Sequence, residues 1–290
     1  MTGPASTLSS LWLALLMLLT LGIVTLAQSV PPPGANDSAA ISNLKSAEPI
    51  VSRRDLEMLG GAVFATAAVA PFDHCIQHNI RTEDLRTSAS LVHVANALAF
   101  TGGPGPFVLG GALYLAGEGT GSRSVASLGL TTTEATVVAA ALNGLIKGFA
   151  GRALPNAKSA EPGEFSFGRG FHDGNGAFVS FPSGHTAASF ATATVMVEEA
   201  AIWNPQSRHI VAPIAYATAT LVAVSRLYQN VHWASDLPIG AAIGIWSGRT
   251  VVRWQHRHPN NWLARELLGA NVLPNSHDIR ITASFGLGDH

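Results

Sequence analysis

The chain has 290 residues, of which 47% are hydrophobic and 12% charged, and its 17 basic residues nearly balance its 18 acidic ones. This balance gives no basic surface for nucleic acid, and the low charge indicates that much of the surface is buried in the core, in partners or in lipid. Because Cys75 is the single cysteine, the chain cannot form an intrachain disulfide and cannot supply a pair of cysteines to a zinc site. We expect it to be a small buried side chain.

An export signal is predicted at the N-terminus. Residues 11–27 form a leucine-rich run that ends in Thr25-Leu26-Ala27, which has the small-x-small form of a cleavage site. Residues 1–27 are therefore a signal peptide or an uncleaved anchor, and the Pro- and Ser-rich residues 28–50 are a linker. In both cases we expect the chain to leave the cytoplasm for the cell envelope, as an exported or membrane-embedded protein.

Six apolar stretches follow, and their length and alanine content favour helices over strands. The turn residues of 101–106 divide the second stretch into two helices, and Thr131 with Glu134 forms a capping-box pattern that predicts a helix start. The sequence predicts an all-α domain over residues 51–255, a bundle of about six core helices. A polar tail over residues 256–290 is irregular or holds a short strand near Ile281. The stretches are 56–72, 89–115, 133–149, 186–202, 210–226 and 237–252.

Most of these stretches are short for crossing a membrane. Spanning takes about 20 mostly apolar residues, and here Ala, Gly and Thr contribute as much as Leu or Ile. Small residues let helix backbones approach closely, both in soluble bundles and at transmembrane interfaces. This composition favours a compact exported bundle over a multi-pass one, with membrane association as the alternative.

Polar clusters interrupt the apolar stretches at four places. Each has a structural explanation by itself, because a lysine can extend from a helix end, a serine can cap a helix and an arginine can pair on the surface. Together they supply what phosphoryl transfer requires, which is cations around three phosphate oxygens, a nucleophile and a general acid. The clusters are Lys147 with 151–155, Pro182-Ser183-Gly184-His185, Ser225-Arg226, and His232 with Asp236.

The roles within these clusters follow from residue type. Lys147 and Arg226 are cations that can hold phosphate oxygens. Ser183 and Gly184 stand at a predicted helix N-terminus, whose free N–H groups and positive dipole end favour phosphate. Two histidines remain for the nucleophile and the general acid.

Asp236 stands four residues after His232 and is suited to hold its ring in one tautomer. Pro238 would clash with the carbonyl of Ala234 inside a helix. A helix that begins near Asp236, with Pro238 in its first turn, avoids the clash, and His232 then meets Asp236 through a bend.

The order and spacing of these residues resemble the second and third signature motifs of the type 2 phosphatidic acid phosphatase (PAP2) superfamily. All eight specified residues match, from Pro182 to His185 and then Ser225, Arg226, His232 and Asp236. The resemblance implies a helical bundle, no metal or other cofactor, and a covalent phosphohistidine intermediate. It also implies that His232 is the nucleophile, Asp236 orients it, His185 protonates the leaving oxygen, and Lys147, Ser183, Gly184 and Arg226 hold the phosphate.

The first motif of that family departs from its pattern here. Lys147 and Pro155 are in place, but Leu154 stands where the family has an arginine. We expect Arg152, or Arg169 from the following loop, to replace the missing cation. Without a replacement, phosphate affinity should fall by about 1.5–3 kcal/mol, the size of one charge-assisted hydrogen bond, which would leave a slower or more selective enzyme.

Residues 156–180 form a loop that is rich in Gly and Phe and is suited to act as a lid or to contact substrate. Its phenylalanines suit either contact with an acyl chain or packing of the loop, and His172 and Asp173 are predicted to be ordinary loop residues. The substrate class is a phosphorylated lipid or a small soluble ester, and the sequence indicates no oligomeric state. Two alternatives are a vanadium-dependent haloperoxidase, with vanadate in the phosphate pocket, and a non-catalytic phosphate-binding envelope protein.

Overall fold

The computed structural model describes residues 50–80, 85, 87–157 and 161–258. The predicted signal or anchor (1–27), most of the linker, and the tail from residue 259 with its predicted strand lie outside these residues. Within them the chain is helical, which confirms the predicted all-α fold, and its β structure is one isolated bridge between Arg152 and Phe165. The α-helices are α3 (Arg53–Val69), α4 (Asp73–Ile80), α6 (Ala89–Gly102), α7 (Gly105–Thr120), α8 (Arg123–Ala150), α9 (Gly184–Trp203), α10 (Arg208–Tyr228) and α11 (Asp236–Arg257).

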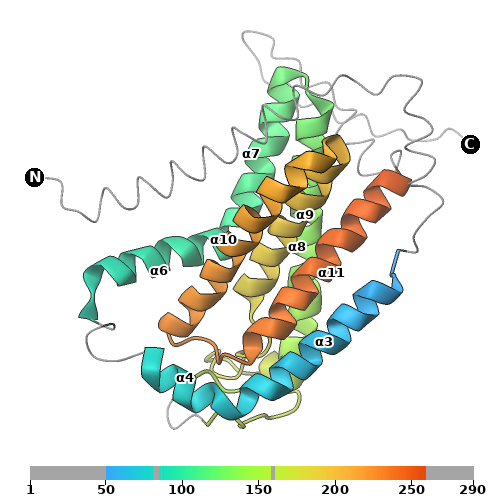
Figure 1. Ribbon diagram of the computed structural model, residues 1–290. Helices are drawn as coiled ribbons and strands as arrows, with labels where there is room; N and C mark the ends of the chain where they lie inside the picture. The colour runs from blue at the N-terminus through green and yellow to red at the C-terminus, as the bar shows by residue number, and fades with distance from the viewer. Residues whose placement is uncertain (1–49, 81–84, 86, 158–160, 259–290) are drawn as a thin grey trace, which may run out of the picture.

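The helices form a bundle around α9, which packs antiparallel to α8 and α10 and parallel to α11, while α7 packs along α8 and α3 along α11 (Figure 1). Leu128, Val195 and Ile243, from three different helices, belong to one buried apolar cluster in its centre. Helices α8 and α10 end, and α9 and α11 begin, at one end of the bundle, which we call the site end. The described parts of the following loop, residues 151–157 and 161–183, also lie there.

Glycines let α11 approach α9 closely, which confirms the predicted role of small residues. Gly240, Gly244 and Gly248 follow one another at four-residue spacing and so share one helix face. A Cβ atom on Gly240 would lie 2.7 Å from the carbonyl oxygen of Ser183, and one on Gly244 would lie 2.3 Å from that of Ala187. The first turns of the two helices, which carry the predicted site residues, are therefore held at backbone contact.

Two local expectations are wrong. Helix α8 begins at Arg123, so Thr131 and Glu134 lie inside the helix instead of capping it. Three threonines of this helix, Thr132, Thr133 and Thr136, donate their hydroxyls to carbonyls of the preceding turn, as Thr132 does to Leu128 at 2.7 Å. Cys75 is exposed, because the short helix α4 is polar and lies at the margin of the bundle.

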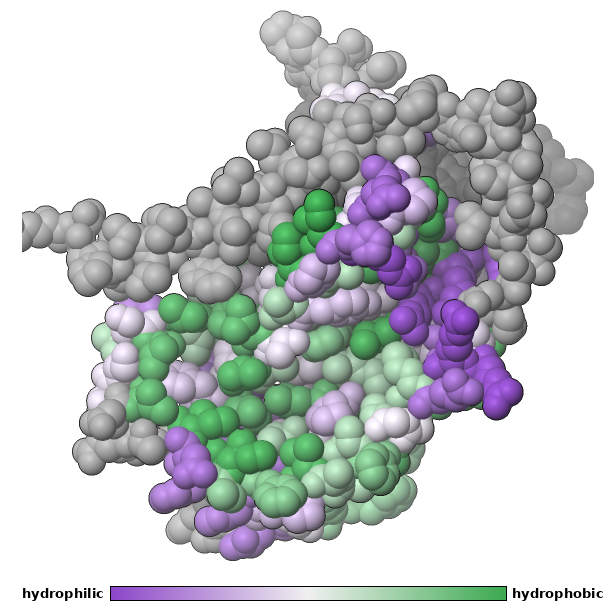
Figure 2. Space-filling model, viewed as in Figure 1, coloured by the Kyte–Doolittle hydropathy of each residue, from purple (hydrophilic) through white to green (hydrophobic). Residues whose placement is uncertain are grey.

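Among the described residues, three helical segments are long and apolar enough to cross a membrane. They are Arg53–Ile80 and Arg123–Ala150, each of 28 residues, and Pro205–Tyr228, of 24 residues. Large apolar side chains point outward from the bundle, with Phe64 76%, Leu115 69% and Ile210 67% exposed, and Figure 2 shows a broad hydrophobic face. The structure thus favours the membrane-embedded alternative. The sequence favoured the other one because the polar threonines of α8 concealed the length of that helix.

Candidate active site

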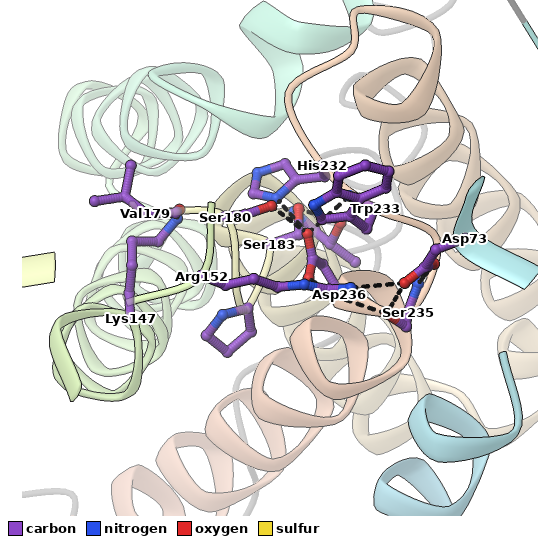
Figure 3. Close-up of polar contacts among 12 residues, drawn as sticks. Asp73, Lys147, Arg152, Val179, Ser180, Ser183, His232, Trp233, Ser235 and Asp236 are labelled. Atoms are coloured by element: carbon purple, nitrogen blue, oxygen red, sulfur yellow. Dashed lines mark hydrogen bonds and ion pairs between the residues drawn. The ribbon is translucent and has the colours of Figure 1, made fainter. Parts of the chain in front are cut away.

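The carboxylate of Asp236 is the centre of the site (Figure 3). Helix α11 begins at Asp236 with Pro238 in its first turn, as the position of the proline requires. The Oδ2 atom of Asp236, which is fully buried, accepts hydrogen bonds from Ser180 Oγ at 2.6 Å, from the backbone N–H of Trp233 at 2.8 Å and from Nδ1 of His232 at 3.3 Å. The bend before α11 therefore brings His232 and Asp236 together as expected.

This contact sets the tautomer of His232. Burial acts to raise the pKa of Asp236, but the hydrogen bonds from His232 and Ser180 and the charge of Arg152 outweigh it, so the pKa lies below its usual value. An ionised carboxylate only accepts hydrogen bonds, so the proton is on Nδ1 and Nε2 keeps its lone pair. Burial, together with the charges of Lys147 and Arg226, lowers the pKa of His232 against the opposing effect of Asp236, which keeps the ring neutral and nucleophilic.

His185 lies in the first turn of α9, at the site end and outside the three candidate membrane spans. Its ring sits against the turn between α6 and α7, where a Cβ atom on Gly103 would lie 3.0 Å from Nε2 of His185. Burial, together with the positive charges of Arg226 and Lys147, lowers the pKa of His185 to about 3. These charges act on the ring because the three side chains converge on one region.

Both predicted cations reach this region. Lys147, in the last turn of α8, donates a hydrogen bond from Nζ to the carbonyl of Val179. Arg226, near the end of α10, donates from one terminal nitrogen to the side chain of Gln229, while its buried Nε has no hydrogen-bond partner within the described residues. A buried donor without an acceptor is costly, and a phosphate oxygen would satisfy it.

The N-terminus of α9 offers backbone donors. The Ser183 side chain caps the helix, since its Oγ accepts from the backbone N–H of Thr186 at 3.4 Å and from the hydroxyl of Thr186 at 2.8 Å. The backbone N–H of Ser183 donates to the carbonyl of Asp236. The N–H groups of Gly184 and His185 are left for an anion, as the start of a helix provides.

Asn143 is a residue that the sequence analysis missed. It lies one turn before Lys147 on α8, is buried, and donates to the carbonyl of Pro182 at 3.4 Å. A Cβ atom on Gly184 would lie 3.2 Å from its amide nitrogen, so glycine allows the two segments to meet. Asn143 and Lys147 are four residues apart and so share one face of α8. This spacing is the pattern from which the sequence could have indicated Asn143.

Arg152 does not replace the missing phosphate cation. Its Nε donates to the carbonyl of Pro162, one terminal nitrogen donates to Ser235 and Asp236 at 2.8 and 2.5 Å, and the other donates to Asp73 and Pro162 at 2.7 and 2.6 Å. A guanidinium has five N–H donors, and these contacts occupy all of them. The expectation that Arg152 binds phosphate is therefore corrected, and the residue instead holds the far side of Asp236 (Figure 3).

Asp73 completes this buried network. It is fully buried on α4 and accepts from the backbone N–H of Ser235 at 2.8 Å and from its hydroxyl at 2.5 Å, in addition to the contact with Arg152. Nothing in the local sequence around Asp73 indicated this role, because its partners lie 79 and 162 residues further along the chain.

Some aromatic residues of the loop between α8 and α9 are buried, and others are exposed. Phe178 is buried, and the guanidinium of Arg169 lies 3.4 Å above its ring. Phe167 and Phe171, 86% and 50% exposed, pack against Phe149 at ring-centre distances of 5.7 and 4.9 Å. The three form an exposed aromatic cluster at the site end.

Comparison with known proteins gives three findings. Residues 128–259 match the family model of the PAP2 superfamily. Over 86 residues the chain is 45% identical to a lipid A 1-phosphatase of Porphyromonas gingivalis; this covers 30% of the chain but 18% of that relative, so the chain matches less than a fifth of its length. The crystal structure of a transmembrane PAP2-type phosphatidylglycerolphosphate phosphatase from Bacillus subtilis is similar in fold, with a TM-score of 0.50 and 19% identity over 70% of this chain and 96% of that one.

Proposed function

Because the chain belongs to the PAP2 superfamily, we propose that it is a membrane-embedded phosphatase that hydrolyses lipid phosphate monoesters through a phosphohistidine at His232. The observation that carries the proposal is the contact between His232 and a buried, ionised Asp236, beside a second histidine and two cations. A lipid substrate is supported by the exposed cluster of Phe149, Phe167 and Phe171, and by the relatives named above, a lipid A 1-phosphatase and a phosphatidylglycerolphosphate phosphatase. A small soluble ester would present the same phosphate group, so hydrolysis of both should be compared.

The proposed reaction has two steps. Nε2 of His232 attacks phosphorus in line with the ester bond, that bond breaks, and His185 gives a proton to the leaving oxygen, which departs as the lipid alcohol. Water then attacks the phosphohistidine while His185 takes its proton, and inorganic phosphate is released with His232 restored. Lys147, Arg226 and the N–H groups of Gly184 and His185 hold the phosphate oxygens throughout. This scheme assigns no step to a metal or other cofactor.

We expect kcat/KM to be highest in acid. The pKa of His185 is about 3, so at higher pH its ring is neutral before substrate binds. His185 must then take from the monoanionic phosphate ester the proton that it gives to the leaving oxygen. A phosphate monoester loses its second proton near pH 6, and above that pH kcat/KM should fall by about tenfold per unit. A pH profile between about 4.5 and 8.5 tests this, and a value that stays flat above about pH 6 would show that His185 holds its own proton.

Restoring the missing cation should raise the rate. Leu154 is half-buried, and its backbone N–H donates to the carbonyl of Ala177 at 2.7 Å, so the side chain can change without loss of that bond. Arg152 does not replace the family's arginine, and Arg169 stacks on Phe178. Leu154→Arg should therefore increase kcat/KM about tenfold or more by adding a charge-assisted hydrogen bond to phosphate. The uncharged variant Leu154→Met is the control, and a rate for Leu154→Arg below that of the control contradicts the proposal.

We also propose that the site end faces the periplasm. Among the described basic residues, those at the opposite end outnumber those at the site end, and basic residues favour the cytoplasmic side. The opposite end carries Arg53, Arg54, Arg123, Arg208, Arg249, Arg253 and Arg257, and the site end carries Lys147, Arg152, Arg169 and Arg226.

Cys75 provides the test of orientation. It is exposed, lies on α4 at the site end, and is the only cysteine of the chain. A membrane-impermeant maleimide should label it in intact bacterial cells, and Cys75→Ser should remove the label. Labelling that requires opening of the inner membrane would place the site in the cytoplasm.

A further inference from the structure

A cavity of about 340 Å³ lies at the end of the bundle opposite to the active site. It is formed where α3 and α10 begin and α9 and α11 end, and Figure 2 shows hydrophilic side chains gathered where α3 begins and α11 ends. The proposed catalytic residues do not line it. Its walls include five arginines and one glutamate, namely Arg54, Arg208, Arg249, Arg253, Arg257 and Glu198.

Carboxylates neutralise only part of this charge. Asp55, fully buried behind the cavity, pairs with Arg253 at 2.7 Å and with Arg249 at 3.6 Å. Glu198 lies 3.7 Å from both Arg249 and Arg208. His256 also lines the cavity, but Glu199 lies 3.0 Å from it and balances its charge when it is protonated. Two carboxylates, Asp55 and Glu198, therefore form ion pairs with three of the five arginines.

Arg54 and Arg257 remain, and neither has an ion pair or hydrogen bond within the described part of the chain. Fastening α3 to α11 explains the contacts of Asp55 with Arg249 and Arg253, but it does not explain these two. An excess of positive charge around a concave surface favours an anion. Each basic residue is an arginine, whose planar fork matches the oxygens of a phosphate group.

The position of the cavity indicates the source of that phosphate. Helices that can cross a membrane end around it, which places it at the level of the lipid headgroups, and basic pockets between such helices recognise anionic headgroups. We propose that this cavity binds the phosphate of an anionic lipid in the leaflet opposite to the active site. The inference rests on membrane embedding and not on the proposed catalysis, so an inactive chain that still binds lipid here would leave it standing.

The test compares lipid binding by the full chain and by two matched double variants in zwitterionic detergent. Native mass spectrometry with added phosphatidylglycerol should show binding to the natural chain. The affinity of the double variant Arg54→Gln with Arg257→Gln should be about thirtyfold lower. The control pair, Arg53→Gln with Arg123→Gln, removes the same charge at the same end from exposed residues outside the cavity, and it should bind like the natural chain. Phosphatidylcholine should not bind to the cavity.

The other possible results show where the lipid binds and which anion occupies the cavity. Equal loss in both double variants would overturn the proposal, because general attraction to the charged end would then explain binding. Loss in Arg226→Gln but not in the cavity variant would also overturn it, since the lipid would then occupy the active site. Inorganic phosphate that binds the cavity as tightly as the lipid would overturn the lipid source. Hydrolysis of p-nitrophenyl phosphate at the natural rate would show that the cavity variant is folded.

Discussion

Replacing His232 by alanine is expected to abolish release of phosphate from a lipid phosphate monoester, with kcat lowered by at least about 10⁴-fold. The change removes the atom that forms the covalent bond, and no other described side chain in the region is held by Asp236 in the same way. Stability should change little, because the hydrogen bonds of Asp236 to Ser180, Trp233 and Arg152 persist. The measurement is phosphate release by the purified chain in detergent, with His209→Ala as control, since His209 is exposed on α10 at the opposite end.

A second variant separates the nucleophile from the acid. His185→Ala should reduce turnover of an alkyl phosphate far more than that of p-nitrophenyl phosphate, because nitrophenolate leaves without needing a proton. Without a base to activate water, the phosphohistidine should accumulate, and acid-labile phosphate on the protein should be detectable after a labelled pulse. Equal loss on both esters with no labelled protein would contradict the roles given to the two histidines. Full activity of His232→Ala would overturn the proposed function itself.

The sequence predicted the parts of the site that depend on neighbouring residues. His232 and Asp236 are four residues apart, and Pro238 alone was enough to place the helix start and the bend that joins them. The cap at Ser183 follows from its position before an apolar run, and the turn between α6 and α7 from its glycines and prolines. In each case the deciding interaction spans a few residues, so a local pattern determines it.

The partners of Arg152 could not be predicted in this way. An arginine two residues from the vacant motif position looked like a substitute phosphate ligand, and only the fold brings Asp73 and Ser235 to it. A buried guanidinium binds the carboxylates that are nearest in space, and the nearest ones here come from α4 and from the start of α11. Membrane embedding could not be predicted from local patterns either. It depended on where α8 begins and on which side chains face outward from the bundle.

Arg152→Met is expected to destabilise the protein by about 3–5 kcal/mol, the cost of leaving buried carboxylates without their partner. Methionine keeps much of the side-chain volume but donates no hydrogen bond, so Asp73 and Asp236 would both lose a charge partner in a site with almost no exposure. Thermal unfolding in detergent measures the loss. Arg169→Met is the control, since that arginine is exposed and stacks on Phe178 in the same loop.

The two possible roles of Arg152 predict different results. A phosphate ligand, replaced by methionine, would raise KM and leave unfolding unchanged. An arginine that neutralises Asp73 and positions Asp236 would lower both stability and kcat. Adding Asp73→Asn to Arg152→Met should then recover part of the stability, because one of the two unpaired charges is gone. Recovery of kcat should be smaller, since Asp236 still lacks its cation and His232 is less firmly held. A raised KM with unchanged unfolding would restore the role that the sequence first suggested for Arg152.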